Sequence, residues 1–218
     1  MGGARRHRWS TIERDLRHSA GPLVAGMDEV GRGPLAGPVV ACVVVMPPDT
    51  RAIAGVNDSK QLRARERERL ADLIRARALA LAIGAASVRE IDEFNIYKAT
   101  VLAMRRALRR LPLRPDHLIV DGKPIRTLGV PHTAVVGGDA RCYSVACASI
   151  VAKVTRDRLM HALARRHPGY QWERNVGYGT PAHLAGLSAH GATVHHRRSF
   201  LPRVQTELFG QGPPASNM

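Results

Sequence analysis

Acidic residues are scarce in this chain. Its 218 residues include 33 Lys and Arg but only 18 Asp and Glu, so the formal net charge is +15. Such an excess of positive charge favours a polyanionic partner, either a nucleic acid or an anionic membrane surface. A basic balance that serves solubility alone is the other explanation.

Long apolar runs are also lacking. The longest extends from Val39 to Met46, whereas a helix that spans a bilayer needs about 20 apolar residues. No apolar segment follows the basic N-terminus, which argues against a secretory signal. Position 6 is an arginine, where a myristoylation signal has Ser or Thr. We therefore expect a cytoplasmic protein with no membrane partner. Separately, we expect a monomer.

Cysteine is rare as well. Cys42, Cys142 and Cys147 form no C-x-x-C pair, and three thiols cannot all pair within one chain. We interpret them as buried free thiols in a protein from a reducing compartment.

The distribution of apolar residues predicts the order of the elements. Apolar, β-branched runs at residues 23–30 and 38–46, with Gly-rich residues 31–37 between them, predict two strands joined by a tight connection. Further strands are expected at residues 78–88, 117–120 and 133–136, and helices at residues 64–77, 91–111, 144–166 and 181–190. This order is typical of an α/β fold in which helices flank a mixed sheet. We expect a loose basic arm over residues 1–21, one main domain over residues 22–202 and a flexible tail over residues 203–218.

The positions of the few acids are the most informative feature. Asp28 and Glu29 lie inside an apolar strand, Asp121 ends a second strand, and Asp139 follows a third through two glycines. Carboxylates brought together at one sheet edge repel each other unless a cation lies between them, and burying each charge costs several kcal/mol. Mg²⁺ takes few protein oxygens and leaves room for water and phosphate. Together with the basic surface, this pattern predicts metal-assisted phosphodiester hydrolysis.

Each acid taken alone has a structural explanation too. An aspartate at a strand end often caps the following turn, and Asp121-Gly122 is a common turn dipeptide. The metal site depends on a strand order that spacing alone does not establish.

Several motifs in this chain resemble those of the ribonuclease HII family. They are Gly26-Met-Asp-Glu-Val-Gly-Arg-Gly-Pro-Leu-Ala-Gly-Pro-Val39, Asn57-Asp-Ser-Lys60, Ile91-Asp-Glu-Phe-Asn-Ile96, Val120-Asp-Gly122, Gly138-Asp139, Ala148-Ser-Ile-Val-Ala-Lys-Val-Thr-Arg-Asp157, Gly177-Tyr-Gly-Thr180 and His196-Arg-Arg-Ser-Phe200. They occur in the family's order and cover about residues 22–200. The resemblance implies a ribonuclease H-like mixed β-sheet flanked by helices, with a helical C-terminal extension.

The resemblance also implies roles for individual residues. Asp28, Glu29, Asp121 and Asp139 would be the catalytic carboxylates that bind Mn²⁺ or Mg²⁺. Residues that resemble the family's substrate-binding positions are Gly31, Arg32, Gly33, Lys60, Asn95 and Tyr178. The Gly-Arg-Gly turn would recognise the ribonucleotide, because backbone approaches a 2′-hydroxyl closely only where side chains are absent. Tyr178 would stack on the neighbouring sugar; its alternative is a packed turn aromatic.

Lys60 and Asn95 have simpler explanations, since a surface lysine and an asparagine near a helix start are both common. The chain also departs from the family at two places. Gly137 stands where the family commonly has lysine, which removes one local positive charge. The run from Cys142 to Cys147 differs from the usual small residues.

The implied reaction is endonucleolytic hydrolysis of the RNA strand of RNA–DNA hybrids. The family also cuts on the 5′ side of a single ribonucleotide embedded in duplex DNA, leaving a 3′-hydroxyl and a 5′-phosphate. Two rivals remain. The sister family ribonuclease HIII usually carries an additional N-terminal domain, for which residues 1–21 are too short. A non-catalytic nucleic-acid-binding protein would not need four acids beside a polyanion.

The tail contains a second, weaker motif. Gln205-Thr-Glu-Leu-Phe209 resembles the peptide by which bacterial repair proteins dock on the sliding clamp. Alternatively, Leu208 and Phe209 fold back onto their own domain.

Overall fold

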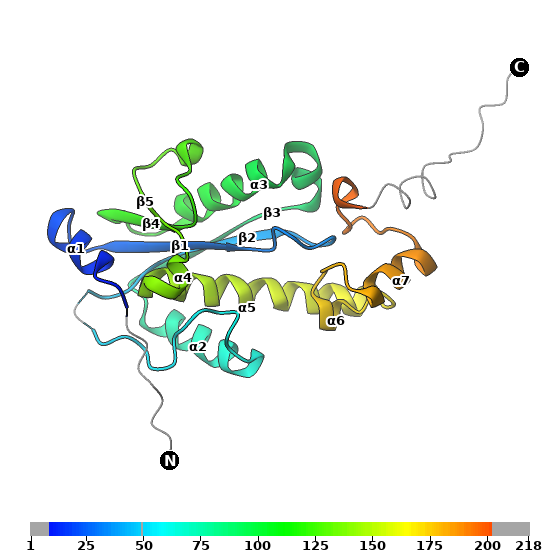
Figure 1. The fold of residues 1–218 in the computed structure, drawn as a ribbon, viewed down its shortest axis with the longest axis horizontal. Coiled ribbons are helices and arrows are strands. Elements are labelled where there is room, and N and C mark those ends of the chain that lie inside the picture. Colours follow the sequence, from blue (N-terminus) through cyan, green and yellow to red (C-terminus); the bar gives the residue numbers. More distant parts are fainter. Residues whose placement is uncertain (1–8, 49, 202–218) are drawn as a thin grey trace, which may run out of the picture.

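A mixed sheet forms the centre of the molecule. The computed structural model describes residues 9–48 and 50–201. The strand order is β3-β2-β1-β4-β5, and the strands are β1 Val24–Val30, β2 Val39–Val45, β3 Ala80–Ala86, β4 His117–Asp121 and β5 Thr133–Val135 (Figure 1). β1 pairs antiparallel with β2 and parallel with β4. The predicted mixed sheet is therefore confirmed.

Helices cover both faces of this sheet. Those of the described residues are α1 Ile12–Ser19, α2 Ala64–Arg77, α3 Val88–Arg110, α4 Gly138–Arg141, α5 Tyr143–Arg166, α6 Trp172–Asn175 and α7 Pro181–His190, with 3₁₀ turns η1 Arg126–Leu128 and η2 Arg198–Phe200. In Figure 1, α3 lies on one face, while α5 and α2 lie on the other. None of the helices within residues 9–48 and 50–201 combines the length and apolar character that crossing a bilayer requires.

Two strand glycines let the long helices approach the sheet. A Cβ atom at Gly26 in β1 would lie 2.2 Å from the carbonyl carbon of Ser144 on α5. A Cβ atom at Gly84 in β3 would lie 2.1 Å from the carbonyl oxygen of Ala103 on α3. Both distances are far below van der Waals contact, so these positions require glycine.

Most predicted elements are found, and two segments differ from the prediction. α2 and α7 have the predicted bounds. α3 begins earlier than expected because Ser87 and Glu90 form a capping box at its start. The loose arm expected before residue 22 includes α1, where the buried Glu13 accepts a hydrogen bond from Ser144 N at 2.7 Å. This contact depends on the fold and leaves no pattern in the local sequence.

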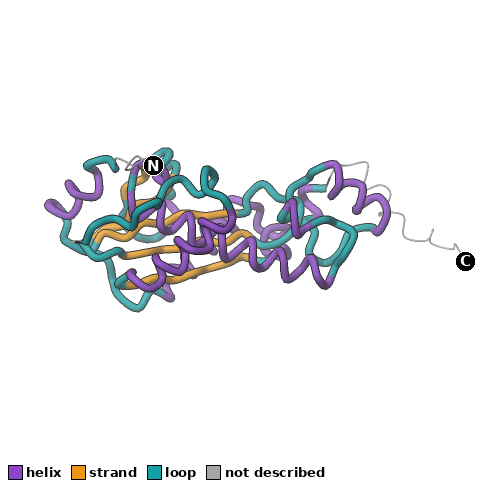
Figure 2. Tube along the Cα trace, turned by 90° about the horizontal axis from the view of Figure 1, so that it is seen from below, coloured by secondary structure: helices purple, strands orange, loops and turns teal. Residues whose placement is uncertain are grey.

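The C-terminal extension packs beyond one end of the sheet, where its short helices surround Trp172 and Met160 (Figure 2). Its backbone is joined to the β1–β2 connection. Leu35 N donates to Gly177 O at 2.8 Å, and Ala36 forms an isolated antiparallel bridge with His196. The extension therefore supports the connection at residues 31–38.

Candidate active site

Two acidic side chains meet at one edge of the parallel pair β1–β4. The register places Met27 beside Val120, and Asp28 and Asp121 directly follow these two residues. Because parallel strands run in the same direction, both aspartates lie at the same end of the pair. The strand order that the sequence left open thus brings Asp28 and Asp121 together.

A cavity of about 430 Å³ opens at this edge. Its lining includes Asp28, Glu29, Asp121, Lys60 and Tyr178, so five of the predicted site residues share one space. A larger cavity, of about 650 Å³, lies at the loop between α3 and β4 and contains none of the four predicted carboxylates. The carboxylates in its lining, and not its size, therefore identify the smaller cavity as the candidate site.

Asp28 is held in an environment that opposes its charge. The residue is 6% exposed, and its Oδ1 accepts a hydrogen bond from Glu29 N at 2.7 Å. Burial, followed by the charges of Glu29 and Asp121, raises the pKa of Asp28 well above its ordinary value. A carboxylate in such surroundings either takes up a proton or needs a cation beside it.

Glu29 connects this cluster to the loop that follows β1. Burial raises the pKa of Glu29, while the guanidinium of Arg32 opposes the rise. Arg32 Nη1 donates to Glu29 Oε1 at 3.2 Å. The Gly-Arg-Gly loop and the carboxylates are therefore in direct contact.

Asp121 and Asp139 are joined through the glycine between their segments. Gly138 N donates to Asp121 Oδ1 at 2.6 Å, and a Cβ atom at position 138 would lie 3.3 Å from that oxygen. Burial raises the pKa of Asp121; the Gly138 bond opposes this rise and the charge of Asp139 adds to it. The close approach of α4 thus brings the fourth carboxylate to the cluster.

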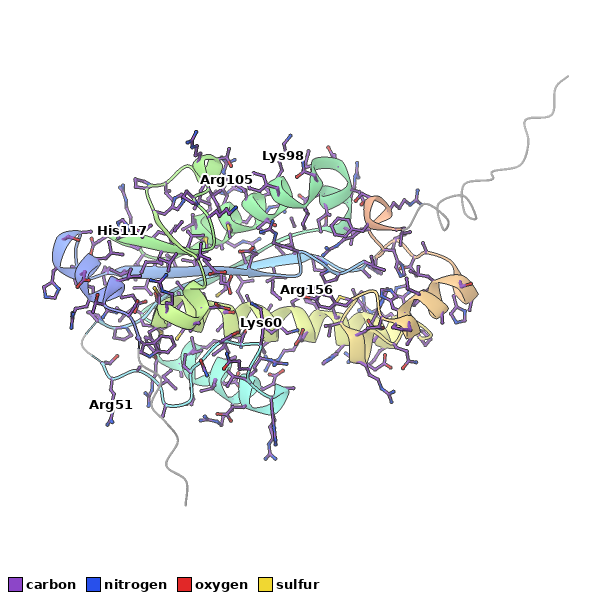
Figure 3. All side chains as sticks on the ribbon, in the orientation of Figure 1. Arg51, Lys60, Lys98, Arg105, His117 and Arg156 are labelled. Atoms are coloured by element: carbon purple, nitrogen blue, oxygen red, sulfur yellow. The ribbon has the colours of Figure 1, made fainter. Side chains whose placement is uncertain are left out.

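Lys60 supplies an ammonium group beside Asp139. Its Nζ lies 3.4 Å from Asp139 Oδ2. Burial alone would lower the pKa of Lys60, but the carboxylates of Asp139 and Asp58 raise it. Figure 3 labels Lys60 on the α5 side of the sheet. At Gly137, where the resemblance leads us to expect a lysine, the backbone is left-handed, with φ +67° and open space around it. Lys60 nevertheless supplies a cation near Asp139.

The donor atoms of the cluster fit a hard divalent cation. Within residues 9–48 and 50–201, no three His, Cys, Asp or Glu side chains converge closely enough to enclose a metal ion by themselves. Mg²⁺ and Mn²⁺ need only one or two carboxylates and take water or phosphate oxygen for the remainder. Buried carboxylates with raised pKa around one cavity suit an ion that is shared with a substrate.

The predicted recognition loop lies against Tyr178. A Cβ atom at Gly33 would lie 3.6 Å from Tyr178 Cε1. Gly177 has φ +91°, and a Cβ atom there would lie 2.5 Å from Ala36 O. Tyr178 is 43% exposed. The two glycine-rich turns therefore present an aromatic ring next to the loop at the cavity.

Asn95 lies elsewhere and has a different local task. It does not line the cavity. Its backbone has φ +71° inside α3, where the helix is kinked, and its Oδ1 accepts from Lys98 N at 3.1 Å. Asn95 therefore caps the second part of α3.

Three further residues received no role from the sequence. Ser149 lines the cavity, and its hydroxyl lies 2.9 Å from that of Ser59 in a hydrogen bond. A hydrogen bond between Ser149 and Asp28 partly opposes the rise in the pKa of Asp28. Arg156 and Arg197 are completely buried and contact the recognition loop. In the sequence, Arg156 lies in the charged half of α5, close to Lys153, Asp157 and Arg158. Neither arginine therefore gave a signal of its burial.

Comparison with known proteins gives consistent results. The ribonuclease HII family profile matches residues 25–202. The chain is 53% identical over 204 residues to ribonuclease HII of Granulibacter bethesdensis, covering 92% of this chain and 93% of that protein. It resembles ribonuclease H2 of Pyrococcus horikoshii, with a TM-score of 0.72, 28% identity and coverage of 87% and 99%. It also resembles ribonuclease HII of Archaeoglobus fulgidus, solved in complex with PCNA, with a TM-score of 0.69, 25% identity and coverage of 83% and 96%.

Proposed function

The chain belongs to the ribonuclease HII family, and from this premise we propose that it cuts duplex DNA on the 5′ side of a single embedded ribonucleotide. As a family member it is a metal-dependent ribonuclease H that hydrolyses RNA in RNA–DNA hybrids. The finer specificity is supported by one observation. The carboxylate cluster of Asp28, Glu29 and Asp121 shares its cavity with Tyr178, which lies against Gly33.

The four carboxylates would act together as metal ligands. Asp28, Glu29, Asp121 and Asp139 would hold Mg²⁺ or Mn²⁺, which when bound activates water and neutralises charge on the phosphate. Lys60 lies beside Asp139 and would offer an ammonium group to a phosphate oxygen. The product ends would be a 3′-hydroxyl and a 5′-phosphate. Asn95 would contact the nucleic-acid strand from the kink in α3.

The recognition elements act on the sugar. Gly31 is buried, whereas Arg32 and Gly33 are exposed. The backbone of this Gly-Arg-Gly turn would contact the 2′-hydroxyl. Tyr178 offers an exposed ring face to the adjacent sugar. The domain that carries these elements would cover residues 22–202 and act as a cytoplasmic monomer, with residues 203–218 as a separate tail.

The test is cleavage of an end-labelled DNA duplex that contains one ribonucleotide, with Mg²⁺, Mn²⁺ and chelator compared. We expect one cut, on the 5′ side of the ribonucleotide, only when metal is present. Extension of one product by a DNA polymerase reports the 3′-hydroxyl, and ligation of the other reports the 5′-phosphate. Cleavage at other positions, or undiminished cleavage in chelator, would overturn the proposal.

We also propose that the tail docks on a sliding clamp through Gln205 to Phe209, a segment outside the described residues. The support is the sequence motif together with the Archaeoglobus relative, which was solved in complex with PCNA. Clamp pull-down with the wild-type chain and with the double variant Leu208→Ala and Phe209→Ala tests it. Loss of binding in the variant is expected, and undiminished binding would eliminate the motif.

A further inference from the structure

Two arginines are buried beneath the recognition loop without an acidic partner. The side chains of Arg156 and Arg197 are both fully buried. Neither guanidinium takes part in an ion pair among the described residues. Burial lowers the pKa of Arg156 to about 10 and that of Arg197 to about 9. Buried charge of this kind is rare unless its hydrogen bonds are satisfied.

Backbone carbonyls satisfy both groups. Arg197 donates from Nη2 to Gly31 O at 2.5 Å, from Nη1 to Arg32 O at 2.9 Å, and from Nε and Nη2 to Gly37 O at 2.9 and 2.8 Å. Arg156 donates to three other carbonyls, those of Pro38, Ala36 and Val176, at 2.9–3.0 Å. Figure 3 labels Arg156 between α5 and the β1–β2 connection. The two side chains therefore hold different parts of the same connection.

The bonds of Arg197 determine where the loop's amide groups point. In a planar trans peptide, the C=O and N–H bonds point in opposite directions. Because Arg197 holds the carbonyls of Gly31 and Arg32 towards the interior, the N–H groups of Arg32 and Gly33 point to the opposite side. Arg32 and Gly33 are exposed, and no described residue accepts a hydrogen bond from either N–H group. Two backbone donors therefore face solvent beside Tyr178.

Arg197 itself is fixed by its own surroundings. Its N–H donates to Leu35 O at 2.8 Å, and its guanidinium lies 5.1 Å from the centroid of the Phe200 ring. Gly31 has φ +93°, and a Cβ atom there would lie 2.2 Å from Arg156 Nε. The loop can therefore rest on both guanidiniums only with glycine at position 31.

We propose that Arg197 is a positioning residue for ribonucleotide recognition: it orients two peptide groups so that the N–H groups of Arg32 and Gly33 meet the ribose 2′-hydroxyl oxygen. The 2′-hydroxyl is the group that separates RNA from DNA and accepts such hydrogen bonds. A planar guanidinium suits the task because its fork reaches three carbonyls at once, whereas an ammonium group is a flexible point charge. This inference rests on the proposed preference for a duplex with one ribonucleotide.

The experiment compares KM for cleavage of a duplex with one ribonucleotide with Ki of the all-DNA duplex as a competitive inhibitor. Both are measured with Mg²⁺ on the full chain. In Arg197→Lys we expect the ratio Ki/KM to fall by about tenfold, since roughly one to two hydrogen bonds are misdirected, while Ki remains unchanged. The adjacent, exposed Arg198→Lys is the matched control and should keep the wild-type ratio. If the unmodified chain itself has a Ki/KM ratio near one, it has no preference for the ribonucleotide. That result would overturn the proposed function, on which the role of Arg197 rests.

General loosening of the loop is distinguished by a second buried variant. Arg156→Lys removes an equally buried guanidinium but leaves the carbonyls of Gly31 and Arg32 to Arg197, so its ratio should fall less. An unchanged ratio in a folded Arg197→Lys protein, or equal losses in both variants that follow their melting temperatures, would overturn the inference. If Arg197→Lys fails to fold, Gly33→Pro deletes one of the two donors directly, and a wild-type ratio in that variant would overturn it too.

Discussion

The carboxylate cluster and the arginine-held loop are adjacent, yet they handle buried charge in opposite ways. Burial, followed by the neighbouring like charges, raises the pKa of Asp28, so this site is electrostatically incomplete. Arg197 lies among four hydrogen bonds to carbonyls, so its site is complete in the protein alone. The difference indicates that the carboxylate cluster needs a cation and a substrate to balance its charge, whereas the arginine-held loop is preorganised. We expect the first to carry the chemistry and the second the choice of substrate.

The largest expected effect is on the rate of cleavage. Asp28→Asn or Asp121→Asn should lower kcat by on the order of 10²–10³-fold or more, as loss of one electrostatic group at a reacting centre does. The surface variant Asp72→Asn, whose side chain is 67% exposed, is the matched control. Wild-type rates in both site variants would show that the carboxylates do not form the active site.

Removing each buried charge should change stability in opposite directions. Arg197→Ala leaves several carbonyls without donors, so the free energy of unfolding should fall by about 3 kcal/mol or more. Asp28→Asn removes a charge that burial disfavours, so in chelator it should be as stable as the wild type or more so. Urea denaturation of both variants measures this contrast. A stable Arg197→Ala protein would show that the loop does not need its guanidinium.

Divalent metal should stabilise the protein in a pH-dependent way. The folded-state pKa values of Asp28, Glu29 and Asp121 are raised, so these groups bind more protons folded than unfolded. Their unfavourable contribution is absent below the unfolded pKa and grows as pH rises through the folded pKa. Mg²⁺ at about ten times its Kd should then add about 1.4 kcal/mol at pH 8, or about 3–6 °C, and less at pH 5. An equal thermal shift at both pH values would contradict this explanation.

The smallest effect is expected for the exposed cation beside the cluster. Lys60 is 79% exposed, and exposed ion pairs contribute about 0–1 kcal/mol, so Lys60→Gln should lower kcat/KM by no more than about fivefold. Lys98→Gln, an exposed lysine on the α3 side (Figure 3), is the control. A loss comparable to that of Asp121→Asn would place Lys60 among the catalytic groups.

The sequence allowed prediction of features that depend on local pattern. The bounds of α2 and α7 followed from periodicity and from proline at the helix start, and the acids in β1 stood out because the strand is otherwise apolar. The juxtaposition of Asp28 with Asp121 depends on β1 pairing with β4, which no local pattern determines. The kink at Asn95 and the burial of Glu13 and Arg197 depend on contacts with distant segments, so they could not be predicted.

The most direct test of this division measures cleavage and substrate preference together, in Asp28→Asn and Arg197→Lys. With the one-ribonucleotide duplex and Mg²⁺, Asp28→Asn should lose cleavage but still bind this duplex in preference to all-DNA duplex in a direct binding assay. Arg197→Lys should still cleave but lose most of its preference. If the cleavage rate and the preference for the ribonucleotide fall together in both variants, the carboxylate cluster and the arginine-held loop do not have separate roles.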